Sequence, residues 1–133
     1  MARHVTVAAV LAAICVVGSA VRAGDPKPGD PTPAEALACL KAGNERFAAG
    51  AETHPHESAA RRTETARDGQ KPVATLVACS DSRGPVEILL DQGIGDLFVI
   101  RVAGNVCDTD EIGSVEYGVG HLGTPAVVVL GHT

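Results

Sequence analysis

The sequence is poor in aromatic residues and in positive charge. Its 133 residues include no tryptophan, one tyrosine and two phenylalanines. This scarcity argues against an aromatic platform on which nucleic-acid bases stack, and any core must be built from Val, Leu, Ile and Ala. Lys and Arg number 11 against 16 Asp and Glu, and the formal net charge is −5. That balance argues against nucleic acid or an anionic membrane surface as the partner.

Residues 1–23 are predicted to be a signal peptide. Arg3 precedes an apolar run over residues 5–17, which is shorter than the roughly 20 residues needed to span a bilayer. Residues 21–23 offer small or apolar side chains at the −3 and −1 positions of a signal-peptidase site. A membrane anchor is the alternative interpretation. We expect a secreted protein, periplasmic in a Gram-negative bacterium, with no membrane association after cleavage.

Cysteine is scarce in the predicted mature chain. Three cysteines remain after the signal peptide, namely Cys39, Cys79 and Cys107. An odd number leaves at least one thiol unpaired in a monomer. Although an exported protein meets oxidising conditions, three scattered cysteines do not make a disulfide scaffold.

A single domain is predicted after a short linker. Residues 24–31 are rich in Pro, Gly and Asp and form the linker, and the domain covers residues 32–133. Thr32 and Glu35 have the spacing of a capping box, which predicts an N-terminal helical arm. The polar stretch that follows predicts a second, solvated helix that ends at Gly69.

The remaining sequence alternates between strand and helix patterns. Apolar runs predict strands at residues 72–78, 96–102 and 126–130, the first two of them buried. Residues 82–91 are expected to form a short helix or turn, and residues 111–122 have apolar residues at helical spacing. Short links between alternating elements predict an α/β fold with a parallel central β-sheet flanked by helices.

Polar groups follow two of the predicted strands. The first strand runs into Cys79, Asp81 and Arg83, and the third runs into His132. Because the carboxyl ends of parallel strands meet at one edge of a sheet, Cys79 and His132 can converge. Thiolate and imidazole are good zinc ligands, and Asp81 could bind the metal or pair with Arg83 instead. One cysteine and one histidine are a weak metal signal, so purely structural roles stay open at this point.

Several motifs together resemble the β-class carbonic anhydrases. They are CSDSR, DQGIGDLFVIRVAGN and SVEYGVGHLGTPAVVVLGHT, preceded by the helix TPAEALACLKAGNERFAAG. The resemblance implies zinc as the cofactor, with Cys79 and His132 as metal ligands. It also implies a second cysteine three residues after His132, which falls two positions beyond Thr133. We therefore expect the printed sequence to be truncated, and by itself to bind zinc poorly and to be inactive.

The resemblance also implies roles for other residues. Asp81 takes the fourth zinc position or releases it to water, and Arg83 keeps this carboxylate ionised. Gln70 matches a glutamine that helps to hold bicarbonate in some members, and Gly104 and Asn105 line the site. The implied reaction is the reversible hydration of carbon dioxide to bicarbonate and a proton by zinc-bound hydroxide, in a homodimer or higher homo-oligomer. Candidates for the proton shuttle are named by residue type only: His54, His56 and His121.

Three other functions are compatible with these residues. The first is hydrolysis of a CO2-like sulfur compound at the same metal site, which only the access to the pocket would distinguish. The second is a non-catalytic module that binds zinc or bicarbonate. The third is a periplasmic thiol protein that uses Cys79 and Cys107 in redox exchange, which the lack of a Cys-x-x-Cys pair disfavours.

Overall fold

The computed structural model describes residues 29–133. The predicted signal peptide and residues 24–28 of the predicted linker lie outside the described residues, so both stay predictions. Within residues 29–133, none of the helices combines the length and the apolar character needed to cross a membrane.

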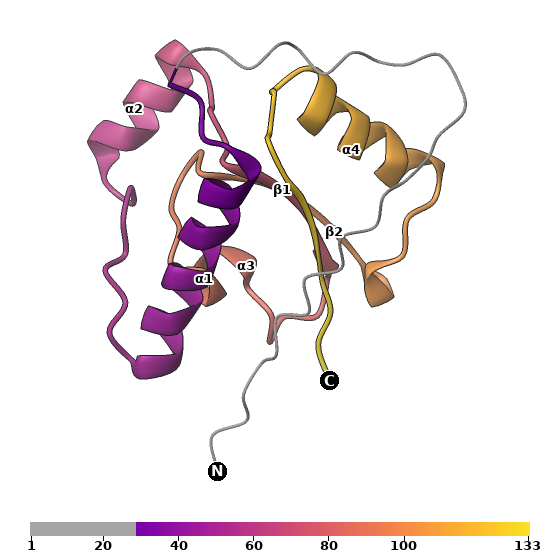
Figure 1. The fold of residues 1–133 in the computed structure, drawn as a ribbon, viewed down its shortest axis with the longest axis horizontal. Helices are drawn as coiled ribbons and strands as arrows, with labels where there is room; N and C mark the ends of the chain where they lie inside the picture. The colour runs from indigo at the N-terminus through magenta and orange to yellow at the C-terminus, as the bar shows by residue number, and fades with distance from the viewer. Residues whose placement is uncertain (1–28) are drawn as a thin grey trace.

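A parallel β-sheet lies at the centre of the described part of the chain (Figure 1). Its strands run side by side in the order β2-β1-β3, and in both pairs the strands are parallel. Thr75 in the middle strand pairs with Phe98 on one side and with Val127 on the other. The strands are β1 (Ala74–Cys79), β2 (Leu97–Val102) and β3 (Val127–Leu130). The predicted parallel α/β sheet is therefore confirmed.

Helices cover both faces of this sheet. They are α1 (Pro33–Ala49), α2 (Ala59–Asp68), α3 (Val86–Leu89) and α4 (Thr109–Gly120), with a short 3-10 turn, η1 (Ala103–Asn105), after β2. Side chains alternate along β1: Leu76 packs with residues of α1 and α3, whereas Thr75 faces Gly118 of α4. Helices α1 and α3 therefore lie on one face and α4 on the other.

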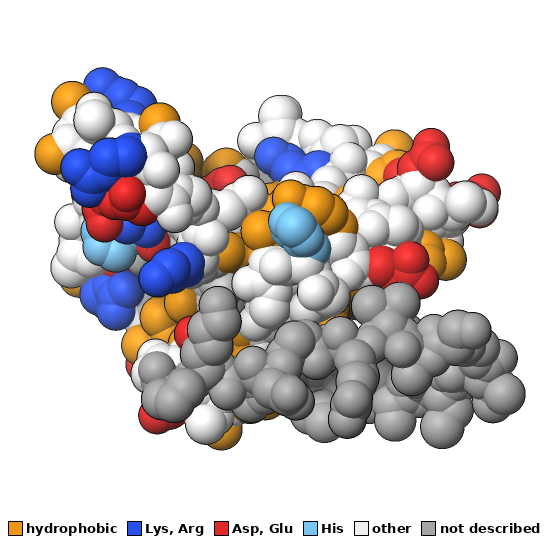
Figure 2. Space-filling view, turned by 90° about the horizontal axis from the view of Figure 1, so that it is seen from above, with side chains coloured by type: hydrophobic (Ala, Val, Ile, Leu, Met, Phe, Trp, Pro, Cys, Tyr) orange, Lys and Arg blue, Asp and Glu red, His pale blue; other side chains and the backbone are white. Residues whose placement is uncertain are grey.

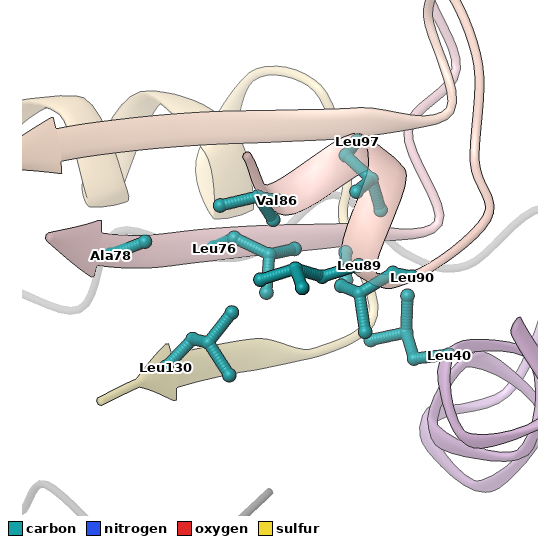
Figure 3. Close-up of a cluster of buried hydrophobic side chains, with 9 residues drawn as sticks. Leu40, Leu76, Ala78, Val86, Leu89, Leu90, Leu97 and Leu130 are labelled. Carbon is teal, nitrogen blue, oxygen red and sulfur yellow. The ribbon is translucent and has the colours of Figure 1, made fainter. Parts of the chain in front are cut away.

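The hydrophobic core lies between β1 and the helices α1 and α3 (Figure 3). Leu76 and Val86 are completely buried. Leucine and valine, not aromatic residues, fill this space, as the composition predicts. The core cluster comprises Leu40, Ala74, Leu76, Ala78, Val86, Leu89, Leu90, Leu97 and Leu130.

The prediction that the second strand is buried is wrong. Only the middle strand, β1, is buried on both faces, whereas β2 has the exposed Arg101 and several half-buried residues. The reason is the strand order: β2 lies at an edge of the sheet in the described chain, so fewer side chains surround it. The same holds for β3, where Val127 and Val129 are 43% and 47% exposed.

Helix α1 begins and packs as its sequence requires. The Thr32 hydroxyl accepts the Glu35 amide at 3.2 Å, and the Glu35 carboxylate accepts the Thr32 amide at 2.8 Å. The predicted capping box is thus confirmed. Further along, a Cβ at Gly43 would lie 1.7 Å from the carbonyl oxygen of Leu90. Only glycine therefore allows α1 to approach α3 this closely.

Helix α2 is held by polar contacts because it buries no residue of its own. The Arg61 Nε donates to the Ile94 carbonyl at 2.9 Å, and its Nη2 lies 3.3 Å from the Asp96 carboxylate. Lys and Arg side chains gather on the side of the molecule where α2 lies (Figure 2). The predicted solvated helix is confirmed. It is α2, which lies at the periphery of the molecule and carries the basic surface.

Candidate metal centre

The ends of β1 and β3 bring Cys79 and His132 together. Ala78 pairs with Leu130 in the parallel register, so both strands end at the same edge (Figure 3). Beyond that edge, Cys79 and His132 line the same cleft and are close enough for each to shift the pKa of the other. The convergence predicted from the sequence is therefore confirmed. An open cleft lies beside this pair, and it is lined by Ala78, Cys79, Arg83, Gly84, Leu89, Leu130, Gly131, His132 and Thr133.

The surroundings of Cys79 favour its thiolate. The hydrogen bond with His132 is the largest cause that lowers the pKa of the Cys79 thiol, which falls to about 7. The backbone amides of Asp81 and Gly104 add to it, with their nitrogens 3.4 and 3.3 Å from the sulfur. The same hydrogen bond raises the pKa of His132. The sulfur is thus prepared as an anionic ligand near neutral pH.

The carboxylate of Asp81 is held by Arg83. The Arg83 Nε and Nη2 donate to the two carboxylate oxygens at 3.0 and 2.8 Å, and the Arg83 amide donates at 2.9 Å. The side-chain hydrogen bonds from Arg83 are the largest cause that keeps the pKa of Asp81 well below its usual range. Asp81 is therefore ionised at any pH near neutral, and Arg83 fixes its direction.

Gly104 belongs to the site through its backbone. The turn after β2 places the Gly104 amide on the Cys79 sulfur, with φ of 74° at this glycine. Asn105 follows, also with a positive φ of 45°. The structure therefore brings the Gly104 amide to the Cys79 sulfur, but the residues that line the described cleft do not include Gly104 or Asn105.

The structure does not bring Gln70 to Cys79 of the same chain. Gln70 precedes the first residue of β1 and lies near Gly95, which precedes β2. Cys79 is at the other end of β1, about 17 Å away for six extended residues. We therefore do not assign Gln70 to the site of its own chain.

The candidate proton shuttles have other partners. His54 lies 3.7 Å from the Glu57 carboxylate, and His56 lies 2.7 Å from the Asp96 carboxylate. His121 stacks on the Tyr117 ring with the centroids 4.6 Å apart. The three cysteines of the described chain are free, and Cys39 and Cys107 are exposed.

Sequence reasoning missed Arg101. Its Nε donates to the Cys79 carbonyl at 3.0 Å, and its Nη2 donates to the Asp81 carbonyl at 2.6 Å. The signal in the sequence was a charged residue inside an otherwise apolar strand. Its place beside Ala78, directly before the cysteine, is known only from the sheet register.

Comparisons with known proteins agree with this site. Residues 74–133 match the family model described as carbonic anhydrase. Carbonic anhydrase 2 of Mycobacterium tuberculosis is 51% identical over 100 residues, which cover 75% of this chain and 48% of that protein. The chain belongs to the β-class carbonic anhydrase family.

Further relatives of this β-class carbonic anhydrase chain support the assignment. Carbonic anhydrase of Mycolicibacterium smegmatis is 48% identical over 100 residues, with 75% of this chain and 48% of that protein covered. The crystal structure of the β-carbonic anhydrase CafA of Aspergillus fumigatus matches with a TM-score of 0.50 and 30% identity. That match covers 70% of this chain and 44% of the other. The chain spans about half the length of the curated relatives it matches.

The residues at the site of this β-class carbonic anhydrase chain fit a zinc ion in part. Sulfur from Cys79 and nitrogen from His132 are the donor types that zinc prefers. Asp81, the third predicted ligand, is engaged by Arg83. Accordingly, no group of three or more Cys, His, Asp and Glu side chains within residues 29–133 is arranged to hold a metal ion. The described chain thus offers two donors and one carboxylate held beside them.

Proposed function

We propose that the protein hydrates carbon dioxide reversibly to bicarbonate and a proton, with zinc as its cofactor. The observation that carries the proposal is the meeting of Cys79 and His132 at adjacent strand ends, where both line one open cleft. The family assignment adds support, because the relatives named above are carbonic anhydrases. A CO2-like sulfur substrate has no specific observation in its favour.

Cys79 and His132 would hold the zinc ion. The lowered pKa of the Cys79 thiol means that little free energy is lost in deprotonating this ligand near neutral pH. Zinc, when bound, acts as a Lewis acid that makes water nucleophilic near neutral pH.

Asp81 and Arg83 would orient the attacking water. The Asp81 carboxylate is ionised, so it can accept a hydrogen bond but cannot donate one. Arg83 donates hydrogen bonds to both oxygens of this carboxylate and so fixes its direction. A water molecule that donates a hydrogen bond to Asp81 would direct a lone pair toward the carbon of carbon dioxide. The Gly104 amide, in the turn after β2, would hold the Cys79 sulfur on the other side of the site.

The test compares two cysteine variants of the full-length protein. Cys79→Ser should lose bound zinc and CO2 hydration, measured by metal analysis and by stopped-flow with a pH indicator. The matched control is Cys107→Ser, which removes an exposed free thiol and should leave both unchanged. Wild-type turnover by zinc-free Cys79→Ser protein would overturn the proposal.

We further propose that the protein is exported to the periplasm after cleavage at residue 23 and forms homo-oligomers. The N-terminal pattern supports export, and the exposed Val127 and Val129 on β3 support an apolar contact between chains. N-terminal sequencing of the exported protein should begin at Gly24. Light scattering should give at least twice the chain mass.

A further inference from the structure

The side chain of Arg101 bridges two backbone carbonyls of the turn that carries the metal-centre residues. Its Nε donates to the Cys79 oxygen at 3.0 Å and its Nη2 to the Asp81 oxygen at 2.6 Å. These carbonyls belong to the residues on either side of Ser80, at the point where β1 leaves the sheet. Arg101 comes from the neighbouring strand, β2.

Other groups after β2 contact the same turn. The Ser80 amide donates to the Val102 carbonyl at 3.1 Å, and the Gly104 amide lies on the Cys79 sulfur. These are backbone contacts that most substitutions would leave in place. Arg101, in contrast, contacts the turn through its side chain, so its contribution can be removed by mutation.

The shape of the guanidinium group decides what this contact can do. Arginine presents its donors in a rigid planar fork, whereas lysine is a single charge on a flexible stem. A fork that binds two carbonyls at once fixes their separation and relative direction. The path of the backbone between them then sets where the Cys79 sulfur and the Asp81 carboxylate point.

We propose that Arg101 is a positioning residue of the metal centre, and that its bidentate grip on the Cys79 and Asp81 carbonyls holds the ligand turn in its binding geometry. The inference rests on the proposed function for the identity of the metal. The grip itself is a property of this chain and can be tested without metal.

The first experiment measures amide hydrogen exchange in metal-free, full-length protein. The variants are Arg101→Lys and Arg101→Gln, and the matched control is Arg62→Lys, an exposed arginine of α2. Loss of the fork should speed exchange over residues 79–84 by about tenfold or more, because local opening no longer breaks two hydrogen bonds. Exchange in α1 and α4 should not change. Unchanged exchange over the turn would overturn the proposal, whether or not the protein binds zinc.

The second experiment measures the metal. Zinc affinity, by competition with a chromophoric chelator, should fall about 10- to 100-fold in both Arg101 variants, as for other residues that orient ligands. The visible spectrum of the cobalt(II) form should change in band position or intensity. Arg62→Lys should match the wild type in both. A role in stability alone would lower the melting temperature and leave the cobalt spectrum intact, and that result overturns the assignment.

Two outcomes separate this proposal from the proposed function. If the wild-type protein binds zinc but does not hydrate carbon dioxide, the proposed function is wrong. The comparison of zinc affinity between the wild type and the Arg101 variants then stays valid. If the wild-type protein binds no zinc, the proposed metal centre is wrong, and hydrogen exchange alone then tests whether Arg101 holds the turn. If Arg101→Lys and Arg101→Gln both fail to fold, Arg101 is required for folding of the whole domain, and the proposal of a specific positioning role is wrong.

Discussion

Arg83 holds the carboxylate of Asp81 from two residues away. Its Nε and Nη2 lie 3.0 and 2.8 Å from the two carboxylate oxygens, and its own amide adds a third hydrogen bond. The pair sits in the turn that follows Cys79, on the rim of the cleft that Arg83 lines. The carboxylate is thereby both ionised and fixed in direction.

Replacing Arg83 with lysine should separate these two effects. An isolated aspartate has a pKa of about 3.9, so Asp81 stays ionised near neutral pH without the guanidinium. Lysine cannot reproduce the planar, bidentate contact. We expect CO2 hydration to fall by roughly 10- to 100-fold in kcat. The loss should be similar across pH 6.5–9, measured by stopped-flow.

The control for this variant is Arg67→Lys. Arg67 makes the same kind of fork to Asp68, at 2.8 and 2.6 Å, on exposed α2. It should leave kcat unchanged. A loss for Arg83→Lys that disappears as the pH rises would contradict us, because it would mean that ionisation of Asp81 was limiting.

The hydrogen bond between His132 and Cys79 predicts a titration in metal-free protein. It is the largest cause that lowers the pKa of the thiol to about 7. In His132→Ala the alkylation rate of Cys79 should therefore reach half its maximum at a higher pH, toward the ordinary value of about 8.5. Mass spectrometry of the peptide that contains Cys79 separates it from the exposed Cys39 and Cys107.

The control for the titration is His121→Ala, which removes a histidine stacked on Tyr117. Its midpoint should stay near 7, as in the wild type. A midpoint that does not move in His132→Ala would show that the backbone amides of Asp81 and Gly104 are sufficient to set the thiol pKa.

Local sequence patterns predicted most of the helices and strands and the meeting of Cys79 and His132 at the site. Thr32 and Glu35 are three residues apart, and a capping box needs nothing from elsewhere in the chain. The meeting of Cys79 and His132 also follows from simple geometry, because parallel strands end at one edge. These predictions depend on spacing alone.

Features that depend on strand order or distant contacts were not predicted. No local pattern says that β1 lies between β2 and β3, so β2 was expected to be buried. Arg101 acts through carbonyls about 20 residues away in sequence, and a carbonyl carries no sequence signature. Asp91, likewise, is buried against partners about 40 residues earlier.

Asp91 predicts how stability depends on pH. Burial raises the pKa of its carboxyl, but hydrogen bonds from Arg46, Thr53 and His54 lower it by more, so the folded pKa is well below its usual range. The stabilisation is therefore complete above the unfolded pKa of about 3.9 and is lost as the pH falls below it. We expect the free energy of unfolding to fall steeply between about pH 5 and pH 2.

Asp91→Asn should flatten that acid dependence. It should also lower the melting temperature at pH 7 by roughly 10 °C or more, because Arg46 loses its anionic partner. Urea unfolding at several pH values measures both effects. The control is Glu116→Gln, which removes an exposed carboxylate of α4 and should keep the wild-type curve. An equally steep acid loss in Asp91→Asn would assign the effect to other carboxylates.

Two glycines of α4 predict opposite effects of the same substitution. At Gly118 a Cβ would lie 2.2 Å from the Thr75 hydroxyl and 3.0 Å from the Phe98 ring. Thr75 is fully buried and hydrogen-bonded to Thr124 at 2.7 Å, so it cannot move away. Gly118→Ala should therefore destabilise by about 1–3 kcal/mol through overpacking.

Gly113→Ala, on the same helix, has nothing within 4 Å of its added Cβ. It should stabilise by about 0.5–1 kcal/mol, because alanine loses less backbone entropy than glycine in a helix. Chemical denaturation of both variants measures the contrast, which cancels any general effect of alanine in α4. A stabilised Gly118→Ala would mean that α4 does not pack directly on Thr75. The helix would then stand further from β1, and the packing described for this face of the sheet would be wrong.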